Sequence, residues 1–563
     1  MNVIEIIDDG QLETRDDRSE TIDFEDGDSV RQVVDLTEDE VLSLTEDDYL
    51  TDAGFEQLLL GWGSETRTGA ANAQRTDEVC VDGILYRTGQ SLQLSRGRYL
   101  RIRSVIQYSD GEIFFQGWNM IKTRRHVEIY IPKGGNWEHE LLWLENANDE
   151  QISLTEVQKI VTIHFTNYCD IASDPHRGLI CRLKERRLSK SQASVQYISA
   201  HEADEGFRWQ PRDLRNLWRG ETRPFGDAVR FTEKFSQGVA DSLMEPGDAD
   251  EDTKRARWYT FGDGFCGAGG VSCGANQAGL EIKWAFDASH HATTTYRLNF
   301  ENAVCELGTI DSFLTNYKHF QKVDVSHGSP PCQTFSPAHT REGQNDDKNS
   351  ACIFSCSDLI KTAKPRVHTM EETAGLFNRH KETFDRVILD FIEIGYSVRW
   401  GILNCASYGI PQSRKRLVII ASGPGEVLPM FPEPTHGPGL KPWTTINQAI
   451  GHIPIRAPDH NIQAASAGWA PRMPYDGNGQ ANTITCGGGD ANKNYHPSGE
   501  RRFTKREFAC LQTFPLGFRF GPVQTLRQIG NAVPPALARV LYGEIIRSLQ
   551  QTDEVEMRQL REG

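Results

Sequence analysis

The sequence predicts a doubly wound α/β sheet that follows an all-β domain and an acidic arm. From residue 258 onward, apolar runs of strand length alternate with helical patterns, as in a parallel sheet covered by helices. Between residues 78 and 168, apolar residues alternate with the period of two that is typical of strands. Residues 1–75 are acidic and poor in aromatic residues, a composition that buries too little surface to fold and predicts disorder.

The acidic arm accounts for the charge of the whole chain. Residues 1–56 contain twenty Asp and Glu against three Arg, a balance equal to the formal net charge of -17. Residues 401–540 contain fourteen Lys and Arg against seven Asp and Glu. This local excess would favour a phosphate backbone. A solvated basic face is the commoner cause of such an excess.

Length and composition indicate a multidomain protein of the cell interior. The 563 residues suffice for about three or four domains. No apolar run reaches membrane-spanning length, and the amino terminus lacks the pattern of a signal peptide, so we expect no membrane partner. The twelve cysteines follow no framework spacing and include no Cys-x-x-Cys pair, so we expect reduced thiols and no metal site.

Residues 76–170 are predicted to form the all-β domain, and residues 171–255 a connecting region with some helix. The connecting region carries a basic cluster at residues 182–190 and an acidic stretch at residues 245–252. Trp118, Trp137 and Trp143 are candidates for a peptide-binding cage in the β domain, although burial in the core is more common for such rings.

The α/β region opens with a strand that runs into a glycine-rich turn. Phe265 is followed by Gly267, Gly269 and Gly270, a pattern that lets a nucleotide approach the backbone at a helix amino terminus. About twenty residues later a second apolar run ends at Asp287, where an acid accepts hydrogen bonds from ribose hydroxyls. The pattern favours an adenosine-containing cofactor, and a Rossmann-like fold with another ligand fits these residues equally well.

Cys332 follows a predicted strand and two prolines, in the order Ser329-Pro330-Pro331-Cys332-Gln333. Consecutive prolines fix φ and remove two backbone donors, so the next side chain is presented at the carboxyl edge of the strand. A thiol in this place is a candidate nucleophile. Taken alone, a free cysteine is more often a small buried apolar residue.

Four further segments contain candidate functional residues. They are residues 364–373, 404–416, 502–515 and 528–535. The first is a predicted strand that delivers Glu371, and the second ends in Arg414 and Arg416 beside another strand. Each segment has a structural explanation by itself, but their joint occurrence at these spacings is improbable by chance.

In this order the segments resemble the motifs of cytosine-5 DNA methyltransferases. The resemblance covers residues 258–548 and is most specific at 330–333, 412–416 and 530–533. The chain looks most like the fungal RID group, which is tied to premeiotic silencing of repeated DNA, because a β domain precedes a compact catalytic half with Glu-Glu-Thr at residues 371–373. The β domain resembles a bromo-adjacent homology domain, although a generic β barrel fits nearly as well.

The resemblance implies how the α/β region is divided. The catalytic core would span residues 256–421 and 501–550, a small target-recognition region would span 422–500, and 551–563 would be a tail. Candidate DNA contacts in the target-recognition region are His436, Arg456, Arg472 and Lys493.

The resemblance also implies chemical roles. Cys332 matches the thiolate that adds to carbon 6 of a flipped-out cytosine, and Glu371 the acid at ring nitrogen 3, which burial would keep protonated. Arg416 matches the cation held against the base oxygen, and Arg414 the one that supports the loop after Cys332. Residues 334–348 are polar enough to form the loop that closes over the base, although a flexible linker also explains this composition.

S-adenosylmethionine is the cofactor that the resemblance implies, with no metal. Phe265 is expected against the adenine and Asp287 at the ribose. The other expected contacts are Gly267, Gly269, Gly270, Ile310, Asp311, Pro330, Asn531 and Val533. The chain departs from the family pattern at Thr309, where an acid is usual, and at Glu372, where Asn is usual.

The leading prediction is therefore a nuclear enzyme that methylates cytosine in DNA and contacts histones or other chromatin proteins through its β domain. A DNA-binding silencing scaffold with little turnover is one alternative, motivated by Thr309 and Glu372. An RNA cytosine methyltransferase of the same superfamily is a second. It ranks lower because such enzymes typically lack a large amino-terminal β domain.

Overall fold

The structure of the 563-residue chain is a computed structural model. It describes residues 73–123, 139–169, 178–220, 224, 259–316, 322–331, 352–486 and 494–562. Cys332, Trp137, Lys493, the 334–348 segment and nearly all of the predicted acidic arm lie outside the described residues.

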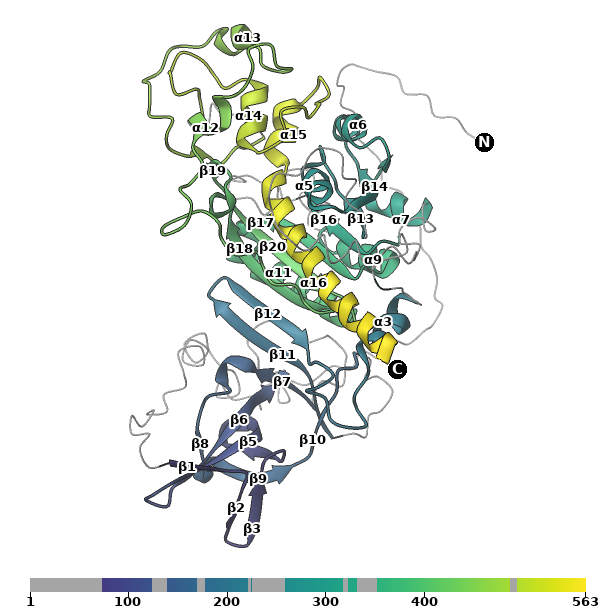
Figure 1. Cartoon of the computed structure of the whole chain (residues 1–563), viewed down its shortest axis with the longest axis vertical. Coiled ribbons are helices and arrows are strands. Elements are labelled where there is room, and N and C mark those ends of the chain that lie inside the picture. The colour runs from purple at the N-terminus through teal and green to yellow at the C-terminus, as the bar shows by residue number, and fades with distance from the viewer. Residues whose placement is uncertain are drawn as a thin grey trace, which may run out of the picture. The chain divides into compact units, whose positions relative to one another are not determined.

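A mostly parallel sheet forms the centre of the carboxyl-terminal half (Figure 1). Its strands, in spatial order, are β15 (Val304–Leu307), β14 (Glu281–Asp287), β13 (Thr260–Gly264), β16 (Val325–Gly328), β17 (Val367–Thr373), β20 (Lys415–Ser422) and β18 (Ser397–Asn404). β20 runs antiparallel to both of its neighbours, and the first five strands are parallel. The predicted α/β core is confirmed.

The order of these strands indicates where a ligand crevice is expected. β13 lies between β14 and β16, so the chain crosses from β13 to one side and later returns to the other. Open α/β sheets bind ligands at such a switch point, outside the carboxyl ends of the strands. The segments after β13 and β16, which contain the glycine-rich turn and the Pro-Pro sequence, therefore flank the crevice.

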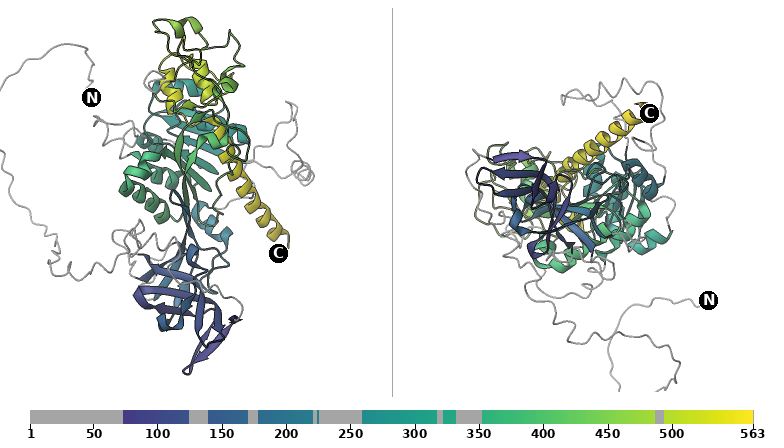
Figure 2. Two further views of the ribbon diagram at one scale, coloured as in Figure 1. Left: turned by 90° about the vertical axis from the view of Figure 1, so that its left-hand side faces the viewer. Right: turned by 90° about the horizontal axis from the view of Figure 1, so that it is seen from below.

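Helices cover both faces of this sheet (Figures 1 and 2). α5 (Gly270–Ala278) and α16 (Pro535–Glu562) share one apolar cluster, which includes Val418 and Ile420 of β20. α9 (Ser355–Ala363) and α11 (Lys381–Glu393) share the other cluster, which includes Leu417 and Ile419. Successive residues of β20 thus point to opposite faces, as the strand period of two requires. The remaining helices of this half include α6 (His290–Asn299), α7 (Ile310–Asn316), α10 (Ala374–Arg379), α14 (Lys505–Leu511) and α15 (Thr525–Asn531).

The predicted amino-terminal β region is present. Its strands include β1 (Ala73–Thr76), β2 (Glu78–Val81), β3 (Ile84–Arg87), β4 (Ser91–Leu94), β5 (Arg98–Tyr108), β6 (Ile113–Lys122), β7 (Glu140–Leu144), β8 (Ile152–Ser153), β9 (Val157–Val161) and β10 (Ile163–Phe165). Trp118 stacks on the buried Trp143 with ring centroids 4.3 Å apart. These two rings therefore belong to the packing of the β region.

The strands continue beyond residue 170, where the sequence predicts a connecting region. β11 (Leu179–Ser189) pairs with β7, and β12 (Gln192–Tyr197) pairs with β18 of the central sheet. The basic cluster concealed these strands because its partners are distant in sequence. Arg182, for example, is buried against Glu140. The expected helix is α3 (Pro211–Arg219).

Where the structure describes the segment 422–500, at residues 422–486 and 494–500, it contains little regular structure. The elements described there are α12 (Ile446–Ile450), α13 (Ile462–Ser466) and β21 (Ala481–Asn482), which pairs with β19 (Gln412–Ser413). Across the described part of the chain, no helix combines the length and apolar character needed to cross a membrane.

Candidate active site at the carboxyl edge of the sheet

An ion pair joins two predicted site residues, Glu371 and Arg416. In the β17–β20 register Arg416 lies opposite Thr373 and two residues from the partner of Glu371, so both side chains occupy one face. The Nε atom of Arg416 lies 2.6 Å from Oε1 of Glu371, and the side chains are 13% and 11% exposed. This short contact fixes the orientation of the Glu371 side chain at the edge of the sheet.

A buried histidine supports the same edge. The Ser329 hydroxyl lies 3.5 Å from Oε2 of Glu371 and 2.6 Å from Nε2 of His327. Nδ1 of His327 is 2.8 Å from the Thr369 hydroxyl on β17. Burial lowers the pKa of His327 to about 3, so the imidazole is neutral. His327 was not among the predicted site residues, because a single histidine in an apolar strand carries no signal of its own.

Arg414 lies beneath this edge and holds other segments together. Its guanidinium is buried and donates to the carbonyl oxygens of Ile484, Gly530 and Ala532. Gln412 was not among the predicted site residues. Its side-chain amide donates to the backbone carbonyl oxygen of Leu511 and so links a further segment to β19. The predicted residues Arg414 and Arg416 thus have different surroundings, although only one residue separates them.

The glycine-rich turn after β13 is tightly built. The Gly267 N–H donates to Oδ2 of Asp287 at 2.9 Å, so the turn is fixed to the end of β14. A Cβ atom on Gly270 would lie 2.4 Å from the carbonyl oxygen of Val533, so only glycine permits this approach. Phe265 has a φ of 57°, an uncommon value for a residue with a side chain and one that clusters at functional sites.

A cavity of about 1130 Å³ opens beside the turn. Predicted residues among its lining are Phe265, Ile310 and Asp311, together with Thr309 and Pro331.

The other predicted residues of this edge lie nearby in the fold but are not part of that lining. Pro330 and Val533 are buried. Gly269 precedes α5 with a φ of 91°. Asn531 is exposed and accepts a hydrogen bond from the Cys486 thiol.

Buried carboxyl groups without an ion pair gather at this edge. Burial raises the pKa of Asp263 to about 7 and also raises the pKa of Asp287 and of Glu372. Within the described ranges, none of the three forms a salt bridge, and Oε1 of Glu372 accepts no hydrogen bond. Asp263 accepts a hydrogen bond from the Ser272 hydroxyl. Perturbed carboxyl groups beside a cavity are typical of functional sites.

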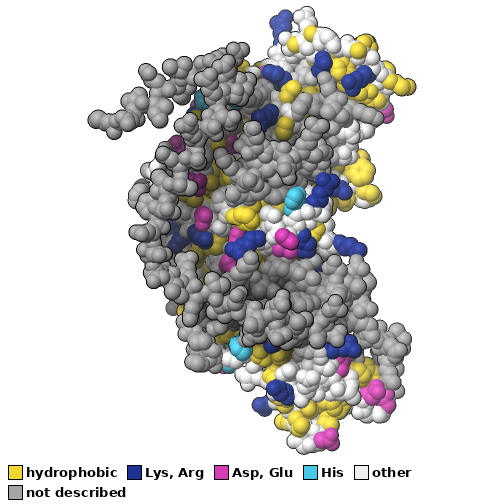
Figure 3. All heavy atoms as spheres, turned by 180° about the vertical axis from the view of Figure 1, so that it is seen from behind, with side chains coloured by type: hydrophobic (Ala, Val, Ile, Leu, Met, Phe, Trp, Pro, Cys, Tyr) yellow, Lys and Arg dark blue, Asp and Glu magenta, His cyan; other side chains and the backbone are white. Residues whose placement is uncertain are grey.

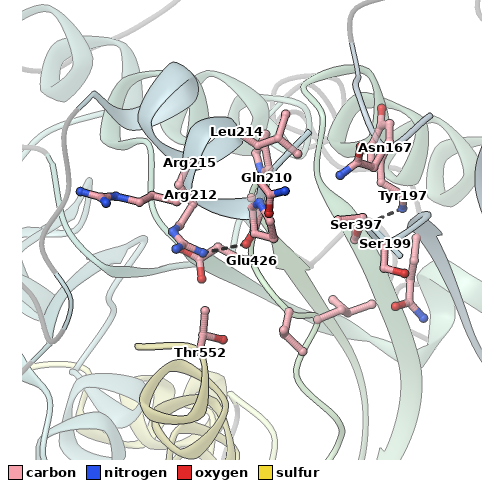
Figure 4. Close-up of a pocket in the computed structure, with 18 of the residues that line it drawn as sticks. Asn167, Tyr197, Ser199, Gln210, Arg212, Leu214, Arg215, Ser397, Glu426 and Thr552 are labelled. Atoms are coloured by element: carbon pink, nitrogen blue, oxygen red, sulfur yellow. Dashed lines mark hydrogen bonds and ion pairs between the residues drawn. The ribbon is translucent and has the colours of Figure 1, made fainter. Parts of the chain in front are cut away.

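A second cavity, of about 440 Å³, lies toward the opposite edge of the sheet (Figure 4). Its lining includes Tyr197, Leu214, Arg215, Glu426 and Thr552 and contains none of the predicted site residues. Among the residues that the structure describes, no group of three or more His, Cys, Asp or Glu is placed to hold a metal ion.

A family model and several known proteins match the region of the chain that contains the candidate site. The family model for C-5 cytosine-specific DNA methylases matches residues 259–436 and 439–547. The type II methyltransferase M.NgoFVII of Neisseria gonorrhoeae is 32% identical over 308 residues, which cover 48% of this chain and 82% of the relative. M1.HphI of Haemophilus parahaemolyticus is 32% identical over 329 residues, 51% of this chain and 87% of the relative. A structure of the S. pombe Dnmt2 methyltransferase covers 52% of this chain and 99% of its own at 18% identity, with a TM-score of 0.39.

Proposed function

Because the chain belongs to the C-5 cytosine-specific DNA methylase family, whose members transfer a methyl group from S-adenosylmethionine to cytosine, we propose that it methylates carbon 5 of cytosine in DNA. One observation carries the proposal. The Glu371–Arg416 pair and Ser329 meet at the edge from which the Pro-Pro segment leads to Cys332. DNA as the substrate is supported by the type II methyltransferase relatives and by the basic excess in residues 401–540.

The residues of this edge suit covalent catalysis. Carbon 5 of cytosine is a weak nucleophile, so a thiolate adds first at carbon 6, and Cys332 is our proposed nucleophile. Glu371 exchanges a proton with ring nitrogen 3, while Arg416 keeps the carboxyl group oriented. After methyl transfer, loss of the carbon 5 proton and of the thiolate restores the aromatic ring. The target base must first leave the duplex stack.

The cavity beside the glycine-rich turn fits S-adenosylmethionine, which supplies the methyl group when bound. Phe265 and Ile310 offer apolar walls for an adenine, and the exposed carboxylate of Asp311 can accept hydrogen bonds. Asp287 uses one lone pair of each oxygen on the Gly267 and Ser289 N–H groups, so each oxygen keeps a second lone pair for a ribose hydroxyl. Burial of this carboxyl group agrees with a ligand that donates to it.

The biological setting that we propose is gene silencing in the nucleus, as in the fungal RID group. The Glu-Glu-Thr sequence at residues 371–373 and the β region before the catalytic half support this assignment. We propose a bromo-adjacent homology type for the β region, with a histone or another chromatin protein as its partner.

A scaffold with little turnover is the second candidate function. It is favoured by Glu372, whose buried carboxyl group stands beside Glu371 without an ion pair in the described structure. Such a protein would bind DNA and cofactor without the covalent step.

A covalent trapping experiment separates these functions. The protein is incubated with S-adenosylmethionine and duplex DNA that contains 5-fluorocytosine, and adducts are counted on a denaturing gel. We expect an adduct for the wild type and for Cys80→Ala, which changes an exposed cysteine of β2, and none for Cys332→Ala. Cofactor binding without an adduct would favour the scaffold. Methyl transfer to transfer RNA in preference to DNA would favour an RNA methyltransferase.

A further inference from the structure

The guanidinium of an exposed arginine in the 422–500 segment lies over two aromatic rings. Cζ of Arg472 lies 4.4 Å from the ring centroid of Trp469 and 5.3 Å from that of Tyr495. No hydrogen bond or ion pair of its guanidinium occurs among the described residues, so its N–H donors remain unused there. The side chain is therefore ordered by stacking alone.

The platform under Arg472 is rigid. The Trp469 indole N–H donates to the carbonyl oxygen of Gly499 at 2.9 Å, and the Arg472 backbone N–H donates to the same oxygen at 2.8 Å. The Tyr495 hydroxyl donates to the carbonyl oxygen of Met473 at 2.9 Å. Gly499 has a φ of 75°, and a Cβ there would lie 2.1 Å from the carbonyl oxygen of Arg472. The backbone contact that joins the Trp469 ring to the Arg472 backbone thus depends on glycine.

Neighbouring arginines lack this combination of order and unused donors. Arg502 also lies over Trp469, at 4.9 Å, but it donates to the carbonyl oxygen of Ala467. Arg501 forms a bidentate pair with Glu507. Arg456 is exposed and has no aromatic contact in the described structure. Of these four arginines, Arg472 alone combines contact with two rings and a guanidinium without a hydrogen bond in the described structure.

We propose that Arg472 determines sequence preference by contacting the edge of a guanine in DNA. This inference rests on the proposed function, since it requires a DNA substrate. A guanidinium offers two parallel donors that match O6 and N7 of guanine in the major groove. Contact with two rings restricts the Arg472 side chain before binding, so less side-chain entropy is lost when it contacts the base. Toward the end of the molecule that carries α12 and α13, Lys and Arg side chains stand on the surface with few acidic ones (Figure 3).

The test measures sequence preference by binding, so it does not require methyl transfer. Full-length protein is mixed with a pool of random duplexes, and the retained DNA is sequenced. We expect the wild type to prefer guanine at one or more positions. Arg472→Lys keeps the charge but loses the fork, so the preference at one of these positions should fall on the order of tenfold or more while other positions are unchanged. Arg547→Lys, at an exposed position of α16 outside the 401–540 segment, is the matched control and should leave every position unchanged.

A second variant keeps the test informative if Arg472→Lys is poorly folded by circular dichroism. Arg472→Gln should also lose the guanine preference at that position, because a glutamine amide pairs with adenine instead. Equal loss at every position with a weaker salt dependence would show a phosphate contact and overturn the proposal. An unchanged preference, or a wild type that prefers no base, would overturn it as well. Failure of the proposed function would instead appear as a missing adduct at 5-fluorocytosine.

Discussion

The two ends of strand β17 use buried charge in opposite ways. Just before the strand, Arg366 is 3% exposed, and all three of its guanidinium nitrogens donate to the carboxylates of Glu426 and Asp553. Near the other end, Glu372 is 1% exposed, and its Oε1 accepts no hydrogen bond within the described ranges. Asp263 lies at the same end of β13, from which β17 is separated by β16, and it is buried without an arginine partner in the described structure.

This difference separates residues that maintain the fold from residues that are available to ligands. A buried ion network contributes to folding only when each charge keeps its partners, and it leaves no group free for chemistry. A carboxyl group buried without a counter-ion keeps a raised pKa and retains unused acceptor positions. The amino edge of the sheet is therefore expected to control stability, and the carboxyl edge activity.

The largest expected effect is the loss of methyl transfer at the carboxyl edge. Glu371→Gln removes the exchangeable proton but keeps the shape of the side chain, so the transfer rate should fall about 10²–10⁴-fold. The midpoint of urea unfolding should change little. Glu382→Gln, an exposed position in α11, is the control and should keep full activity. A variant of Glu371 that retains wild-type turnover would remove this residue from the mechanism.

The matching change at the amino edge should act on stability instead. Arg366→Met leaves the carboxylates of Glu426 and Asp553 buried with fewer partners, which should cost about 3–5 kcal/mol in the free energy of unfolding. Urea denaturation measures this cost. Arg547→Met breaks only an exposed pair with Glu544 in α16 and should cost under about 1 kcal/mol. Similar costs for the two variants would contradict the structural role of the amino edge.

The carboxyl-edge residues were predictable because each lies within a few positions of a strand end. Phe265 follows β13, Asp287 ends β14, and Glu371 lies in β17, so local pattern alone brings them to one edge. The amino-edge network has no such local signal. Arg366 and Asp553 are 187 residues apart, and neither position differs in sequence from an ordinary surface charge.

Long-range packing also explains why other features could not be predicted from the sequence. The pairing of β12 with β18 joins residues 193 and 400, and no pattern in either strand identifies the other. The stacking of Arg472 on Tyr495 likewise depends on a turn that Gly499 permits. The Glu371–Arg416 pair was only half predicted, because the sequence placed both residues at the site without indicating that they bind each other.

A smaller effect is expected where the glycine-rich turn meets the segment before α16. Gly270→Ala places a Cβ 2.4 Å from the carbonyl oxygen of Val533, and the backbone shift that relieves this clash should cost about 1–3 kcal/mol. Cofactor affinity should fall as well, and calorimetric titration with S-adenosylmethionine measures it. Gly543→Ala in α16 meets open space and should instead stabilise the protein by about 0.5–1 kcal/mol. A gain in stability from Gly270→Ala would mean that this turn is looser than its geometry indicates.

The last expected effect concerns pH and the buried acid Asp263. Burial raises its pKa to about 7 in the folded protein, whereas an unfolded Asp titrates near about 3.9. Between these values the folded state holds a proton that the unfolded state releases, so this group lowers stability as pH rises from about 4 to about 7 and has no further effect above that range. Asp263→Asn keeps an acceptor for the Ser272 hydroxyl but cannot ionise.

The melting temperature of Asp263→Asn minus that of the wild type should therefore increase between pH 4 and pH 7 and then level off. Asp358→Asn is the control, because this residue is 60% exposed beside Lys361 and should give a nearly constant difference. A constant difference for Asp263→Asn as well would mean that its carboxyl group ionises freely in the folded protein. The contrast between the two edges would then depend on Glu372 and Asp287. The melting temperatures of their variants can be measured over the same pH range.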